Sequence, residues 1–388
     1  MRIQTNTNSS FPSQVVSEAE KSSLDYGIQV GRAIEGEWFQ EGRAGNRYVQ
    51  SYATFHRLRL YARGEQSVQK YKDELSINGD LSYLNLDWKP VAVISKFVDI
   101  VVNGMANKSY DITTFAQDPF SVKSRTDYAT AIEQDMNTKP MLENIKQELG
   151  MDMARTGNLE DLPESKEELD VHMQMTYKQN VEIAEEEVIN NVLSFNKYDQ
   201  TKARIAYDLT VLGIGASKTR FDKSEGIKID YVDPARIVYS YTEDPNFEDI
   251  YYIGEVKAIS IPELKKQFPD ISDEELQRIQ NMPGNSQYVT GWANYDQNTV
   301  QVMYFEYKTY VDQVWKIKKT DQGLEKTLEK ADTFNPPEND NFDRVSRSIE
   351  VLYTGAKVLG NNYMLEWKMA ENMTRPTADT TKVEMNYC

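Results

Sequence analysis

The stretch of sequence that decides the fold is Asp233–Val256, DPARIVYSYTEDPNFEDIYYIGEV. It contains two Asp-Pro steps, five tyrosines or phenylalanines and six carboxylates within 24 residues. Apolar and aromatic residues alternate with other residues in IVYSY and IYYIGEV, which is typical of β-strands. The carboxylates fall mainly in VDP and TEDPNFED, where Asp and Pro favour turns. The stretch therefore predicts two strands joined by an acidic turn.

The same two-residue period continues on both sides of this stretch. Upstream, ASKTRF and IKIDYV predict two strands separated by DKSEG. Downstream, VQVMYFEYKTYV and VWKIKK predict a hairpin that turns around Asp312 and Gln313. The segment IEVLYTGAKVLGNNYMLEWKM predicts two more strands, which Gly360, Asn361 and Asn362 join as a hairpin turn.

The rest of the chain has helical periodicity. Tyr26, Val30, Ile34 and Trp38 recur every four residues, and a second helix follows from Arg47 to the YARGEQ segment. A helix from Pro90 to Met105 is predicted to bury a core stripe, and a long helix is predicted over Ser165–Phe195. Residues 119–215 are expected to be helical up to Gly213, with breaks at NTKP and GNLEDLPES. The segment SIPELKKQFPDISDEELQRIQ is also expected to be helical, with SDEE as a start signal. The stripe residues of the Pro90–Met105 helix are Ile94, Phe97, Val98, Val101 and Met105.

Composition excludes several classes of protein. The 44 Lys+Arg residues against 61 Asp+Glu give a formal charge of −17, which argues against tight binding of nucleic acid. Cys388 is the only cysteine and the only histidines are His56 and His172, so thiolate zinc clusters and histidine-based triads are not expected. The apolar run Val91–Val102 is short and is interrupted by Lys96 and Asp99, so it is not expected to span a bilayer.

Motifs for catalysis and cofactor binding are not found. P-loop, HExxH and nucleophile-elbow patterns do not occur. The glycines of GIG, Gly213 and Gly215, follow a helix and precede a strand, which is the wrong order for a phosphate loop. We therefore expect no catalytic residues, no cofactor and no metal. The carboxylates of Asp233–Val256 leave one enzymatic alternative open, an acidic carboxylate-dependent hydrolase.

Two segments concentrate positive charge. HRLRLYAR has interleaved apolar residues and is typical of an interface helix, with contact to DNA as a weaker alternative. The later segment WKIKK could bind an acidic partner through Trp315, Lys316, Lys318 and Lys319. Its other interpretation is an exposed strand with scattered lysines.

Read in order, several segments resemble the portal proteins of tailed bacteriophages, most closely those of crAss-like phages. The resemblance covers residues 25 to 388 and rests on the order and spacing of the segments. It marks seven structural motif positions: Tyr61, Gly64, Gln66, Gly213, Gly215, Asp233 and Pro234. The segments are YARGEQ, NLDWKPVAVISKFVDIVVNGMANKSYDI, EEEVINNVLSFNKYDQTKARIAYDLTVLGIGASKTRFD and IKIDYVDPARIVYSYTEDPNFEDIYYIGEV.

The resemblance implies an α+β portal fold with a helix-rich wing, small β layers, a stem helix and an α/β clip. The chain ends at TKVEMNYC, where such portals continue into a second stem helix, tunnel loop and crown, so that part is expected to be absent. On this map the segments are a flexible tail (1–24), the wing (25–260), a segment leading to the stem (261–297), the clip (298–370) and a return toward the second stem helix (371–388).

The resemblance also implies the function. A portal is a non-enzymatic ring of twelve copies at the unique capsid vertex of the virion, assembled in the host cytoplasm, and it conducts DNA during packaging and ejection. The implied partners are further copies of the chain, the major capsid protein, terminase, head–tail adaptor and tail proteins, and double-stranded DNA that passes without sequence-specific binding. No membrane and no cofactor are implied. Besides the hydrolase, another virion adaptor or scaffold protein remains an alternative.

Overall fold

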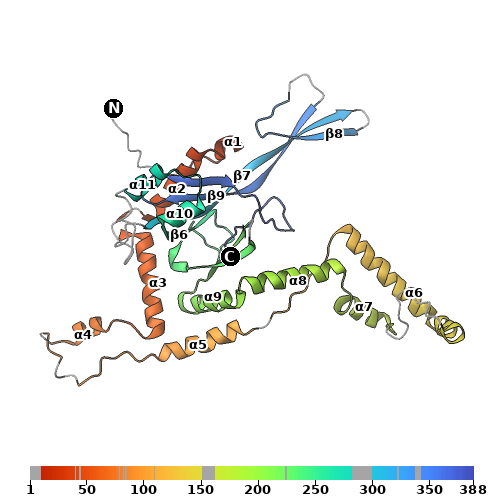
Figure 1. Ribbon diagram of the computed structural model, residues 1–388, viewed down its shortest axis with the longest axis horizontal. Helices are drawn as coiled ribbons and strands as arrows, with labels where there is room; N and C mark the ends of the chain where they lie inside the picture. The colour runs from red at the N-terminus through yellow and green to blue at the C-terminus, as the bar shows by residue number, and fades with distance from the viewer. Residues whose placement is uncertain are drawn as a thin grey trace. The chain divides into compact units, whose positions relative to one another are not determined.

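The computed structural model describes residues 10–388, apart from residues 40, 43–44, 78, 82, 84, 109, 151–161, 223–224, 282–298, 321–322 and 337–341. The chain forms two compact units (Figure 1). Unit 1 combines residues 1–106 with residues 200–388, and unit 2 is residues 107–199. Helices and antiparallel sheet occur together, which confirms the predicted α+β class.

Unit 1 is built on one antiparallel sheet with the strand order β10-β9-β7-β6-β5, and β8 pairs with the outer part of β7. The strands β5 and β6 are the two that Asp233–Val256 predicted, and they pair antiparallel with Val238 opposite Gly254. The predicted hairpin at Gly360 is also present, between β9 and β10. The bounds are β5 Ile237–Tyr239, β6 Tyr252–Ser260, β7 Thr299–Thr320, β8 Gly323–Lys330, β9 Phe342–Val358 and β10 Met364–Met369.

Helix α2 (Leu24–Phe39) covers one face of this sheet, and its four-residue repeat is buried as predicted. Trp38 is 1% exposed, and its indole nitrogen donates to the carbonyl oxygen of Tyr239 and to the hydroxyl of Tyr252, each at 3.1 Å. A buried indole needs such a partner because an unsatisfied N–H in the core is costly. The helix is thereby fixed to β5 and β6.

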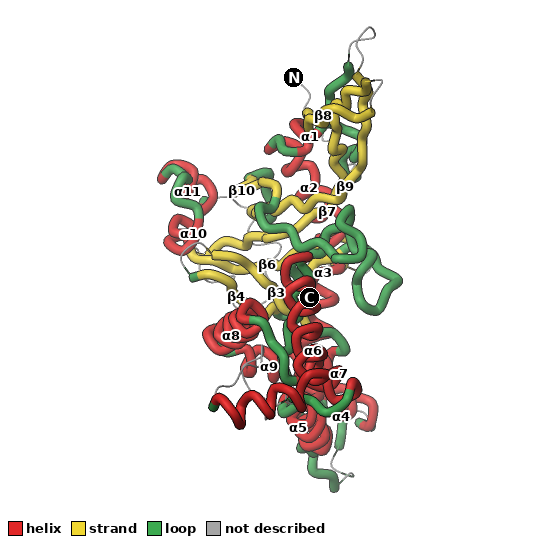
Figure 2. The backbone as a smooth tube through the Cα atoms, turned by 90° about the vertical axis from the view of Figure 1, so that its right-hand side faces the viewer, coloured by secondary structure: helices red, strands yellow, loops and turns green. Residues whose placement is uncertain are grey.

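Two short helices, α10 (Ile261–Gln267) and α11 (Asp273–Gln280), cover part of the opposite face (Figure 2). Leu264, Leu276 and Ile279 pack there against Val300 and Val302 of β7. As SDEE predicted, α11 begins with a capping box between Ser272 and Glu275. The sheet is therefore buried on both faces near its middle.

Phe305 at the centre of the sheet lies between two glycines. It pairs with Gly254 of β6 on one side and with Gly355 of β9 on the other. A Cβ atom built on Gly355 would lie 2.6 Å from Cζ of Phe305, and one built on Gly254 would lie 2.8 Å from its Cβ. The glycines provide the room that the Phe305 ring occupies.

Gly355→Ala should therefore lower the free energy of unfolding by about 1–3 kcal/mol, because the added methyl group overpacks a closed core. Gly104→Ala is the matched control, since nothing lies within 4 Å of a Cβ at Gly104 and the residue is inside a helix. That change should stabilise the helix by up to about 1 kcal/mol. Urea unfolding of both variants tests this, and equal effects would contradict the packing argument.

Unit 1 also contains helices and strands that are not part of this sheet. The pair β3 and β4 forms a separate hairpin, as predicted, and it packs with Ile237, Ile253 and Tyr387. The other bounds are α1 Glu18–Lys21, β1 Glu41–Gly42, β2 Gly45–Asn46, α3 Arg47–Arg63, α4 Gln69–Leu75, α5 Val93–Ala106, α9 Tyr198–Leu212, β3 Ala216–Asp222, β4 Gly226–Val232 and the 3-10 helix η1 Pro234–Arg236.

Unit 2 is helical, with α6 (Pro119–Leu149), α7 (Lys166–Met175) and α8 (Asn180–Phe195). Its small core contains Ile132 and Leu169. Glu182 at the start of α8 is 1% exposed, and it accepts hydrogen bonds from the backbone nitrogens of Ala116 at 3.0 Å and Gln179 at 2.8 Å. The buried carboxylate thus fixes the segment before α6 to the start of α8.

Three details of the predicted helices and strands are wrong. The predicted helix Ser165–Phe195 is two helices, because Gln179 and Glu182 form a capping box that starts α8 anew. No break occurs at NTKP, since α6 continues through Pro140. The predicted turn at Asp312 and Gln313 is absent, because β7 continues and Gln313 pairs with Arg347 of β9.

Contacts in unit 1 also cross the boundaries between the predicted segments. Strand β6, in the segment predicted as wing, pairs along Tyr252–Ser260 with β7, in the segment predicted as clip. In the predicted tail, Phe11 stacks on Tyr252 with ring centroids 5.5 Å apart, and residues 1–9 lie outside the described residues. The segment predicted to lead to the stem (261–297) contains α10 and α11 in its first part. Residues 282–298 lie outside the residues that the structure describes.

Candidate interaction surfaces

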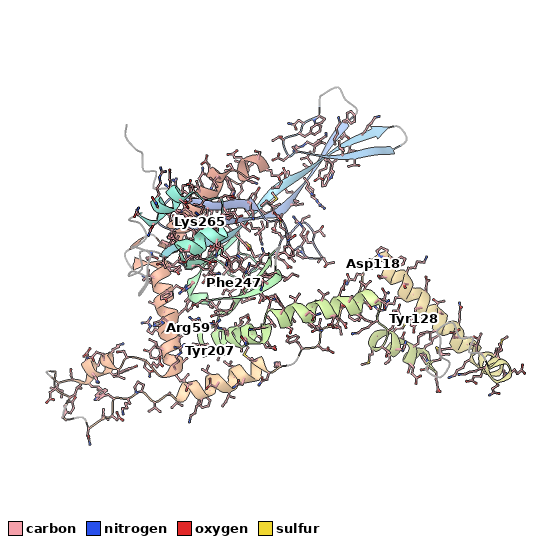
Figure 3. All side chains as sticks on the ribbon, in the orientation of Figure 1. Arg59, Asp118, Tyr128, Tyr207, Phe247 and Lys265 are labelled. Carbon is pink, nitrogen blue, oxygen red and sulfur yellow. The ribbon has the colours of Figure 1, made fainter. Side chains whose placement is uncertain are left out.

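Arg59 lies on α3 (Figure 3). Its side chain joins segments that are far apart in the sequence. Its Nη2 atom donates to Oδ1 of Asp208 on α9 at 2.9 Å and to Oδ1 of Asp233 at 2.8 Å. The hydroxyl of Tyr231 on β4 donates to the other oxygen of Asp208, and burial, together with this hydrogen bond, raises the pKa of Tyr231. Asp208 is 2% exposed, so these partners replace the water that would otherwise hydrogen-bond to its carboxylate. We call these four residues the Arg59 cluster.

Two predicted motif residues belong to this region. Asp233 is a member of the Arg59 cluster, and its side chain also accepts from the backbone nitrogen of Ala235 at 3.1 Å. Pro234 is buried at the first position of η1, where its missing N–H costs nothing. Asp233 and Pro234 therefore fix the backbone at the start of η1, and the Arg59 guanidinium neutralises the Asp233 carboxylate.

The motif YARGEQ ends α3. Gly64 has φ of +75° and caps the helix, and a Cβ at this position would lie 2.7 Å from Cβ of Ala92. Glycine is therefore needed both for the left-handed conformation and for the close approach of the segment before α5. Tyr61 is 39% exposed, and the side-chain oxygen of Gln66 is buried without a hydrogen-bond partner.

The two glycines of GIG are needed for different structural reasons. Gly213 has φ of +78° directly after α9, and it ends the helix. A Cβ at Gly215 would lie 2.8 Å from Cγ2 of Ile205, so glycine allows the chain to pass close to α9 as β3 begins. Neither glycine forms the strand–loop–helix arrangement that a phosphate site requires.

In the acidic turn, Thr242–Asp249, aspartate carboxylates accept hydrogen bonds from groups of the turn itself. Asp249 accepts from the hydroxyl of Thr242 and from the backbone nitrogen of Glu243 at 2.9 Å. Asp244 accepts from the backbone nitrogens of Asn246 at 3.1 Å and Glu248 at 3.0 Å. These hydrogen bonds hold the pKa of Asp249 below its ordinary value, which is the opposite of what a general acid requires. The geometry favours a structural turn over a hydrolase cleft.

A pH dependence follows for Asp249. Its folded-state pKa is lowered from 3.8, so the unfolded chain binds the proton more readily. The stabilisation is full above the unfolded pKa and is lost as pH falls through the folded pKa. Thermal unfolding of the wild type and Asp249→Asn should therefore differ most near pH 6 and converge toward about pH 2.5. A difference that stays constant over this range would contradict the assignment.

Within the described part of the chain, no three His, Cys, Asp or Glu side chains are grouped so that they could hold a metal ion. His56 lies exposed on α3 in unit 1, and His172 lies on α7 in unit 2 with its ring 6.3 Å from that of Tyr128. Among the described helices, none is both long and apolar enough to cross a membrane.

The outer parts of β7, β8 and β9 form an arm, which we define as residues 314–318, 327–330 and 342–346. Lys316 and Lys318 lie on one face of the arm, and Trp315 lies on the other because neighbouring residues of a strand alternate. The predicted set is thus divided between two faces, and the side chain of Lys319 lies outside what the structure describes. Sequence reasoning missed Arg344, which lies directly opposite Lys316.

The apolar stripe of α5 is exposed, which corrects the prediction of a core stripe. Val98 is buried at 8% exposure, but Ile94 is 56%, Phe97 64%, Val101 46% and Met105 40% exposed. We call these four exposed residues the α5 surface. They recur with spacings of three and four and lie on one side of the helix. A contiguous apolar surface of this kind marks a contact with another protein surface.

These features define a structural protein with interaction surfaces. Residues 182–364 match the model of the phage P22-like portal protein family. The match supports the interpretation of the chain as a phage portal protein. Proteins of this family are structural and non-enzymatic. Among curated proteins, none matches the chain.

Proposed function

We propose that the chain is a subunit of a dodecameric portal ring at the unique capsid vertex, of the crAss-like type. The observation that carries the proposal is the match of residues 182–364 to the P22-like portal family. The ring conducts double-stranded DNA during packaging and ejection. It binds the major capsid protein, then terminase during packaging, and afterwards the head–tail adaptor and tail proteins.

The exposed α5 surface supports the assembly of several copies. Side chains such as Phe97 and Ile94, which are more than half exposed in the isolated chain, gain roughly 1 kcal/mol each when a neighbour covers them. A closed ring repeats the same contact between every pair of neighbours, so each subunit needs two different complementary surfaces. The α5 surface is proposed as one of them.

The acidic charge supports passage of DNA without adhesion. Each chain carries a formal charge of −17, and twelve copies multiply this charge around one channel. Like charges repel phosphates at short range, so a channel lined by part of this charge lets DNA slide. Binding at a particular base sequence would instead need groups that read base edges.

We also propose the division of the chain into wing, stem-leading segment and clip. The structure changes how the clip is best tested. Strand β7 lies between β6 and β9, so removal of residues 298–370 would take away the middle of the sheet. Binding of terminase is therefore better tested with substitutions on the arm, which lies outside the buried core. Trp315→Ala, on the face of the arm opposite that of Lys316 and Lys318, should weaken terminase binding and leave the rest of unit 1 folded.

The hydrolase alternative is not favoured, because the acidic turn uses its carboxylates as backbone acceptors. A hydrolase needs no ring, and a scaffold protein needs no closed ring with a central channel. Electron-microscope class averages of the purified chain distinguish these cases. Twelvefold rings with a central channel are expected, and particles without rotational symmetry would contradict the proposal.

A further inference from the structure

The charges of the arm are sorted between its two faces. Over residues 314–318, 327–330 and 342–346, all four basic side chains lie on one face, and both acidic ones, Glu329 and Asp343, lie on the other. Arg347, one position beyond the arm, adds a single positive charge to the second face, where its guanidinium lies 5.7 Å from the centroid of the Trp315 ring. The sorting follows from the strand register, in which Lys316 is opposite Arg344 and Trp315 is opposite Glu329. We call the first face the basic face; it consists of Lys316, Lys318, Lys330 and Arg344.

The basic face is preorganised and accessible. The Lys316 ammonium lies 3.5 Å from the centroid of the Phe342 ring on the same face, which holds this side chain in place. Arg344 donates to the backbone oxygen of Asp332 at 3.0 Å, and both Arg344 and Lys330 are exposed. Leu328, 49% exposed, adds an apolar side chain between the charges. This concentration of positive charge in a chain of net charge −17 is complementary to an acidic surface.

The acidic turn of unit 1 has the complementary chemistry. No Lys or Arg occurs between Ile237 and Val256, and Glu243, Glu248 and Asp249 are exposed. The internal hydrogen bonds of Asp244 and Asp249 fix the backbone of the turn, so the glutamates are presented on a rigid support. Tyr241, 71% exposed, extends this surface with an aromatic ring.

We propose that the basic face of the arm binds the acidic turn of the neighbouring copy of the chain in the ring. The pairing rests on the proposed ring and deepens it by naming two surfaces of the subunit interface. It is a head-to-tail contact between unlike surfaces, as a closed ring of many copies requires. Electrostatic complementarity of this kind speeds association and fixes the register, while the α5 surface supplies apolar burial. Because exposed charges are screened, assembly should slow as salt is raised from about 0.05 M to 0.5 M.

A charge-swap experiment on the full chain tests this pairing. The double variant Lys330→Glu/Arg344→Glu should reduce the rate of ring assembly at low salt at least about tenfold, because it places like charges together. The second variant, Glu243→Lys/Glu248→Lys, should reduce the rate similarly. The two double variants mixed in equal amounts, and the fourfold variant that combines them, should assemble again. Native mass spectrometry and light scattering report the outcome.

The matched control is Lys266→Glu/Arg278→Glu, which makes the same charge change at exposed positions of α10 and α11. It should assemble like the wild type, and thermal unfolding shows whether each variant is folded. An arm variant that assembles into rings at the wild-type rate at low salt, or a fourfold variant that is not rescued, overturns the pairing and leaves the proposed ring standing. A wild type that stays monomeric overturns both. If the arm variant forms rings but loses binding to a DNA duplex probe, the basic face is a nucleic-acid surface and the proposal is wrong.

Discussion

Replacing Arg59 with alanine is expected to lower the free energy of unfolding by about 3–5 kcal/mol, because it leaves a buried carboxylate without its partner. The Arg59 side chain is 19% exposed and that of Asp208 only 3%. The same guanidinium also neutralises Asp233 at 2.8 Å, so one substitution removes two ion pairs. Since the partners lie on α3, α9 and the turn after β4, the loss should loosen all three.

Two further variants distinguish the loss of the ion pairs from the general effect of shortening an arginine side chain on α3. Arg59→Lys keeps the charge but cannot donate to both carboxylates in the same fork geometry, so an intermediate loss is expected. Arg57→Ala removes an exposed arginine two residues earlier on the same helix and should change the free energy of unfolding by less than about 0.5 kcal/mol. Chemical denaturation measures all three. An Arg59→Ala variant as stable as Arg57→Ala would show that the cluster does not stabilise the fold.

The second large effect concerns assembly. Phe97→Glu places a charge in the middle of the α5 surface and should abolish ring formation, because burying an unpaired carboxylate in an apolar contact is very costly. In the isolated chain Phe97 is 64% exposed, so the free energy of unfolding should change by less than about 0.5 kcal/mol. Size-exclusion chromatography with light scattering would then show a folded monomer.

The control is Lys96→Glu, which introduces a carboxylate at the neighbouring exposed position on the opposite side of α5. It should assemble like the wild type. Rings formed equally well by Phe97→Glu and the wild type would show that the α5 surface faces solvent in the assembly.

Much of unit 1 could be predicted from local patterns. The repeat ending at Trp38, the end of the following helix at YARGEQ and the hairpin at Gly360 are confirmed, because each is determined by residues close in the sequence. The predicted turn at Asp312 fails for the opposite reason. Polar residues there pair across the sheet with Ser348 and Arg347, and those residues are more than 30 positions away.

The interaction surfaces show a second limit. An apolar stripe such as that of α5 predicts burial, but the pattern is the same whether the covering surface belongs to the same chain or to another copy. The sequence indicates the basic segment at Lys316 but not its neighbour Arg344, because only the register of β7 and β9 brings the two side by side. Asp233 was marked as a motif residue, and its partner Arg59 could not be found from spacing alone.

The central claim, that this chain is a subunit of a portal ring, is tested most directly by the native mass of the purified full chain. We expect one dominant species with twelve times the mass of the chain, which persists on dilution at low salt. A monomer at every concentration, or an assembly with a fixed and different number of copies, would contradict the dodecameric portal ring.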